Sequence, residues 1–211
     1  MRLPIRWRQL VAAPLAALAL GAWISKEDAF KDLPLGKKVS NPLPIGKVHV
    51  PLPEGDWVVA GRRVGQARAV GGAAHNDETM ADVILVDIAG GTLRGLLSIY
   101  TILDYGSLRR WSKSDFCKNE NLFYRQEDEM PGLNSYFSWG VTHHRMGGSA
   151  NFVGRDHIKE RTEFLASKNV AMPAVMMAAE FHIASGPKLL NVVYRRNPDL
   201  ENISPSQAGE G

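Results

Sequence analysis

Residues 81–100 read ADVILVDIAGGTLRGLLSIY, two apolar runs rich in branched side chains with Gly90-Gly91 between them. A pair of glycines supplies the positive φ angles of a two-residue hairpin turn, so the sequence predicts two antiparallel strands. One face of the second strand carries Leu93, Leu97, Ile99 and Leu103 with Gly95, and the other carries Arg94, Ser98 and Tyr100. We therefore expect this strand to be half buried.

Six more segments have strand patterns and are joined by turn-forming residues. KVHVPLP (47–53) and DWVVAGR (56–62) flank the turn Pro53-Glu54-Gly55. NLFYRQ (121–126) and LNSYFSWGVTHHRM (133–146) flank an acidic connection, EDEMPG, which we expect to be a solvated loop. AVMMAAEFHIA (174–184) and KLLNVVYRR (188–196) flank Ser185-Gly186-Pro187. Strands joined by such short turns form an antiparallel sheet.

One helix is expected, from Arg155 to Lys168, with Asp156 as its N-cap and Asn169 ending it in a left-handed conformation. We expect Ile158, Thr162 and Leu165 to share its buried face, with Phe164 beside them. The predicted fold class is α+β, a curved antiparallel sheet of about eight strands with one late helix packed on a face.

The first 24 residues have the pattern of a secretory signal peptide or signal anchor. Arg2, Arg6 and Arg8 precede Leu10–Ile24, a run of 15 residues without a charge. As a helix this run covers roughly 22 Å of a hydrocarbon core roughly 30 Å thick, which suits a signal core better than a permanent span. The pattern predicts a periplasmic protein, or one anchored in the inner membrane and facing the periplasm.

The remaining chain divides into three parts by composition. Residues 25–45 contain three prolines among lysines and predict an extended tether. Residues 46–200 predict a single α+β domain, and residues 201–211 a frayed polar tail. Without the three leader arginines, the 25 basic and 22 acidic residues become 22 and 22. A neutral domain has no general attraction for phosphate backbones, so we expect no nucleic-acid partner.

The search for chemistry finds little. Six histidines are present without an HExxH pattern, and no GxSxG or SxxK pattern occurs, so we predict no catalytic residues and no cofactor. A metal site assembled from His144, His182 and a carboxylate such as Glu180 is geometrically possible, because Glu180 and His182 share one face of a strand, but it requires that the strand carrying His144 be a near neighbour. Cys117 is the single cysteine, so an exported chain could not close an internal disulfide.

Several stretches resemble a family of uncharacterised proteobacterial exported proteins. They are LPEGDWVVAGR (52–62), the region from Cys117 through NLFY to FSWGVTHHRM (137–146), NVAMPAVMMAAEF (169–181) and NVVYRRNPD (191–199). The resemblance covers roughly residues 46–200 and implies export, but no activity, cofactor or site residues, because the family has none assigned. It also implies that Ser138 stands where relatives carry a second cysteine, which leaves Cys117 without a family disulfide.

Three functions remain open. The first is a non-catalytic envelope module that binds another envelope protein through a sheet face or edge strand, with the membrane reached through residues 1–24. The second is a binder of a small apolar ligand in a pocket between helix and sheet. That pocket would be lined by Trp139, Phe164, Leu165, Met177 and Phe181. The third is a metal-dependent enzyme built on His144, Glu180 and His182.

Overall fold

The computed structural model describes residues 30–66, 79–103, 122, 124–130, 135–146, 156–186 and 188–201. The predicted leader, Cys117 and residues 202–211 of the predicted tail lie outside this part of the chain. Among the described residues, no helix has both the length and the apolar character needed to span a membrane.

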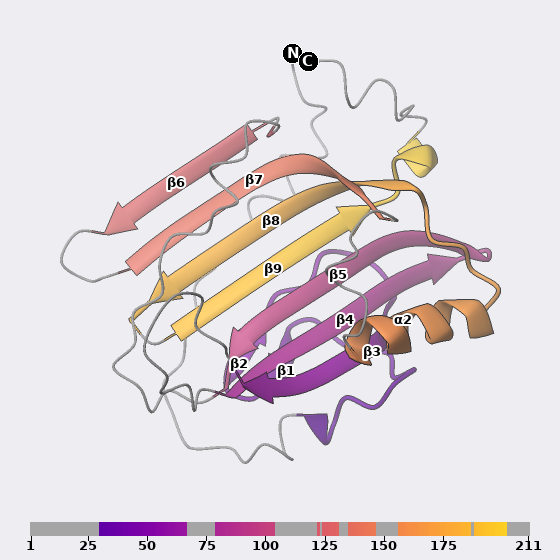
Figure 1. Cartoon of the computed structure of the whole chain (residues 1–211), viewed down its shortest axis with the longest axis horizontal. Coiled ribbons are helices and arrows are strands. Elements are labelled where there is room, and N and C mark those ends of the chain that lie inside the picture. Colours follow the sequence, from indigo (N-terminus) through magenta and orange to yellow (C-terminus); the bar gives the residue numbers. More distant parts are fainter. Residues whose placement is uncertain are drawn as a thin grey trace.

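A seven-stranded antiparallel sheet forms the centre of the domain, in the order β3-β4-β5-β9-β8-β7-β6 (Figure 1). Its strands are β3 (Trp57–Gln66), β4 (Thr79–Ala89), β5 (Thr92–Ile102), β6 (Tyr124–Met130), β7 (Ser135–Arg145), β8 (Val175–Ser185) and β9 (Lys188–Arg196). The remaining elements are β1 (Leu43–Ile45), β2 (Val48–Val50), α2 (Asp156–Ser167) and the 3-10 turn η4 (Pro198–Glu201). The predicted α+β class, with one late helix packed on an antiparallel sheet, is confirmed.

The hairpin at residues 81–100 forms as predicted. β4 pairs with β5, and Gly90 and Gly91 join them with φ angles of 57° and 73°. The register shifts where Asp87 pairs with Gly95 but Ile88 pairs with Leu93, so Arg94 is an extra residue in β5. Because a bulge reverses which face a side chain points to, Leu93 lies on the opposite face from Leu97. The expectation of a half-buried strand is wrong, because β5 carries apolar side chains into cores on both faces.

The bounds of the helix agree with the prediction to within one residue, although Asp156 is its first helical residue and not the residue before it, and the buried face differs. It spans Asp156–Ser167, and Asn169 has a φ of 52°. His157 and Leu165 are its buried residues, whereas Thr162 is exposed. The helix packs on the face of β3 and β4 that carries Ala60, Ile84 and Val86 (Figure 1).

The predicted tether is wrong for residues 30–45. Leu33, Leu43 and Ile45 are buried, and they join Val48 and Val50 of β2 in a core against the face of the sheet opposite α2. The alternation of apolar side chains in this proline-rich segment provides a face that is more stable buried than in water. Among the described strands β1 pairs with β2 alone, so this hairpin is a separate two-stranded sheet, and the described part of the domain has three layers.

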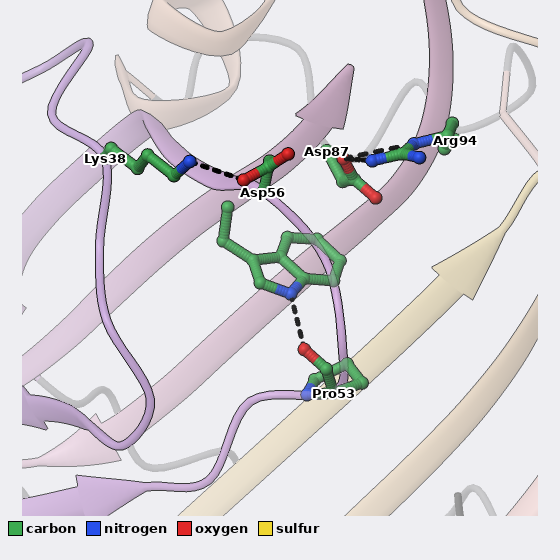
Figure 2. A network of polar contacts seen from close by, with 6 residues as sticks. Lys38, Pro53, Asp56, Asp87 and Arg94 are labelled. Carbon is green, nitrogen blue, oxygen red and sulfur yellow. Dashed lines mark hydrogen bonds and ion pairs between the residues drawn. The ribbon is translucent and has the colours of Figure 1, made fainter. Parts of the chain in front are cut away.

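Trp57 links the small hairpin to the sheet. The residue is 2% exposed, its ring meets Tyr194 edge to face with 5.9 Å between centroids, and its Nε1 donates to the carbonyl oxygen of Pro53 at 2.9 Å. Figure 2 shows the ion pair of Arg94 with Asp87, in which Nη2 lies 2.7 Å from Oδ1. It also shows Lys38 paired with Asp56, and the hydrogen bond from Lys38 lowers the pKa of that carboxyl.

Candidate functional site: an open sheet edge and a buried polar strip

The β3 edge of the sheet is closed by the chain itself. Residues 36–39 pair with the first half of β3, where Gly36 N donates to Val59 O at 2.8 Å and Val59 N donates to Lys37 O at 2.9 Å. In the second half, the Arg62 backbone N–H donates to the Glu160 carboxylate of α2 at 2.9 Å. A partner strand would have to displace these bonds, so this edge is protected.

The β6 edge lies at the other end of the strand order. Within the part of the chain that the structure describes, no strand lies beyond β6 at this end of the sheet (Figure 1). Residues 124–128 of β6 are all exposed. The pairing of β6 with β7 is regular from Tyr124 opposite Val141 to Met130 opposite Ser135, without a bulge. An exposed, regular edge strand presents backbone N–H and C=O groups to any strand of matching sequence.

The sequence predictions missed this edge in part. The acidic residues Glu127, Asp128 and Glu129 lie in β6, although we expected a solvated loop. Their polarity hides the strand because β6 has few apolar side chains to alternate. The sequence did offer one signal: the clear strand pattern at residues 135–145 follows a short turn, and such a strand needs an antiparallel partner immediately before that turn.

A strip of polar side chains crosses the sheet on the face that α2 covers at its β3 end. Arg195 of β9 donates to the Ser98 hydroxyl at 2.9 Å, and Asn191 donates to the Glu180 carboxylate at 2.9 Å. Burial lowers the pKa of Arg195 to about 10, which leaves the guanidinium protonated at neutral pH. Burial raises the pKa of Glu180, against the opposing effects of Asn191 and Arg195. Because each charge has a polar neighbour on the adjacent strand, the strip joins β5, β9 and β8.

Arg161 brings a second arginine from α2 toward the same strip. Burial lowers its pKa, and its charge in turn lowers the pKa of Arg195. Its Nε atom is buried without a hydrogen-bond partner. Sequence reasoning missed this residue because Arg161 looks like a solvent-facing position on an amphipathic helix, and only the docking of α2 shows which face is buried.

The structure does not bring the three predicted metal ligands together. β7 and β8 are neighbours, as the site requires, and Glu180 and His182 share one face of β8. However, His144 is paired with Met176, whereas His182 is paired with Ser138. Six residues of strand separate the two histidine positions by roughly 20 Å, far beyond the reach of one ion. The side chain of His144 lies outside the described part, and the described residues contain no group of three or more His, Cys, Asp or Glu side chains that could hold a metal.

The predicted apolar pocket does not assemble from its five residues either. Leu165 and Phe164 pack with Met176, which faces α2. Met177 and Phe181 are odd-numbered positions of β8 and therefore lie on the opposite face, where Phe181 is paired with Val192. The backbone of Trp139 is paired with Phe181, and its side chain lies outside the described part.

No protein-family model matches this chain, and no curated protein matches it.

Proposed function

We propose that this chain is a non-catalytic protein-interaction module of the cell envelope, and that an extended protein strand adds to β6. The difference between the two sheet edges carries the proposal. The chain covers the backbone of β3 with residues 36–39 and with the Glu160 side chain, but leaves the side chains of residues 124–128 exposed. Strand addition gives affinity through main-chain hydrogen bonds and selectivity through alternate side chains.

The leader predicted from residues 1–24 supports the envelope part of this proposal. A cleaved signal would deliver the domain to the periplasm, and an uncleaved one would hold it at the inner membrane. The described domain begins to pack at Phe30, so few residues would separate it from such an anchor. A short separation would restrict the domain to partners that are close to the membrane surface.

Site-specific photo-crosslinking in intact cells tests the proposal. The full chain carries a photoreactive amino acid at Gln126 or Asp128 of β6, both exposed. The matched control carries it at Glu163 on α2, whose side chain is 66% exposed. We expect discrete crosslinked bands from the β6 positions that are missing from the α2 position. Equal labelling from α2, or no adduct from either β6 position, would contradict strand addition.

A further inference from the structure

β6 has a charge pattern that complements itself. It reads YRQEDEM, and Arg125 and Glu127 lie two residues apart on one face of the strand. Inside the subunit they are paired with Gly140 and Ser138 of β7. The opposite face carries a row in which Tyr124 donates to Gln126 Oε1 at 3.4 Å and Gln126 Nε2 donates to Asp128 Oδ2 at 3.2 Å.

From this pattern we infer that the strand added to β6 is β6 of a second copy of this chain, antiparallel and centred on Gln126. The inference rests on the proposed function and names its partner. A two-fold axis perpendicular to the sheet pairs each copy's Arg125 with Glu127 of the other, twice, and pairs Tyr124 with Asp128 of the other, twice. The two seven-stranded sheets then become one continuous sheet.

The charges distinguish this register from its neighbours. Because paired residues share a face, two-fold pairing must be centred on a residue. A register centred on Glu127 places the Glu127 carboxylates of the two copies opposite each other. A register centred on Asp128 places the two Asp128 carboxylates opposite each other and also pairs Glu127 with Glu129 of the other copy. Like charges directly opposite one another destabilise a sheet, whereas opposite charges stabilise it. Only the register centred on Gln126 pairs opposite charges without placing like charges in opposition.

The first experiment measures dimerisation of the full chain in detergent by sedimentation velocity, from about 1 to about 100 µM. Arg125→Glu and Glu127→Arg each create two like-charge pairs, so each should weaken the dimer at least about tenfold. The double variant Arg125→Glu/Glu127→Arg restores both opposite-charge pairs and should return within about threefold of wild type. A wild-type chain that stays monomeric, or a double variant as weak as the single ones, overturns the inference.

A second experiment tests the register. In a Cys117→Ser background, Gln126→Cys places two thiols opposite each other across the axis, with Cα atoms about 4.5–5.5 Å apart, within disulfide range. Asp128→Cys places them roughly 13 Å apart along the strands, which is out of range. We expect a disulfide-linked dimer from the first variant only, and equal yields from both refute the register. A monomeric chain whose β6 crosslinks to a different protein overturns the dimer but not the proposed function, whereas no β6 adduct at all overturns both.

Discussion

At Gly61 the backbone of α2 lies directly against the sheet, and replacing this glycine tests how the helix is held on β3. A bulge between Val59 and Gly61 places Gly61 opposite Ile84, on the face beneath the helix. A Cβ atom there would overlap the backbone carbonyl oxygen of His157 and lie 3.1 Å from its carbonyl carbon. Since the obstruction is backbone, Gly61→Ala must move the whole helix instead of one side chain.

The expected cost follows from what the movement breaks. Forcing a methyl group into a packed contact costs about 1–3 kcal/mol. Lifting α2 also stretches the 2.9 Å hydrogen bond from Arg62 N to the Glu160 carboxylate, and bonds of this charged kind contribute about 1.5–3 kcal/mol. We expect Gly61→Ala to lower the free energy of unfolding by about 3–5 kcal/mol, and the melting temperature by roughly 10 °C.

Urea unfolding of the full chain, followed by tryptophan fluorescence, measures this change. Gly65→Ala is the matched control, because it lies in the same strand and its Cβ would meet only the flexible Arg63 side chain at 3.4 Å. The free energy of unfolding of the control should differ from that of the wild type by less than about 0.5 kcal/mol. If Gly61→Ala does the same, α2 does not pack on β3 as described.

The same unfolding assay checks three further changes. Leu165→Ala removes a buried side chain from the core under α2 and should cost about 2–5 kcal/mol, whereas Thr162→Ala, on the exposed face, should change stability by less than about 0.5 kcal/mol. Ser138→Ala deletes a buried hydroxyl without a hydrogen-bond partner and should stabilise by about 1 kcal/mol; a comparable loss would show that the hydroxyl is bonded. Burial raises the pKa of Glu180 above its ordinary 4.5, so the folded state binds that proton more tightly than the unfolded state does. The stability that the protonated Glu180 carboxyl gives to the folded state is therefore fully present below about pH 4.5 and is lost as the pH rises through the raised pKa. The stability of Glu180→Gln relative to wild type should increase from about pH 4 to about pH 7, and a constant difference would contradict the burial.

The hairpin at residues 81–100 shows how far local pattern reaches. Gly90-Gly91 and its flanking branched residues predict the β4–β5 pair, and Ser185-Gly186-Pro187 predicts the β8–β9 pair. Both turns are decided within a few residues, so the sequence contains all the information they need. The pairing of β5 with β9 joins segments almost a hundred residues apart, and no local pattern specifies it.

The predicted sites failed for a similar reason. Alternation correctly placed Glu180 and His182 on one face, but register alone fixes that His144 lies opposite Met176. The apolar pocket mixed both faces of β8, because alternation does not say which face α2 covers. Arg161 shows the opposite error: a charged position of the helix, which the sequence suggested was solvent-facing, is partly buried where α2 packs on the sheet.

By itself, the sequence determined the α+β class, the local hairpins and the extent of the single late helix, because turn chemistry and side-chain periodicity act over a few neighbouring residues. Only the tertiary structure decided that residues 36–39 cover one edge of the sheet and that β6 is the last described strand at the opposite edge. Strand order depends on contacts between segments distant in the chain, whose free energy comes from burial in the assembled layers and leaves no local trace in the sequence.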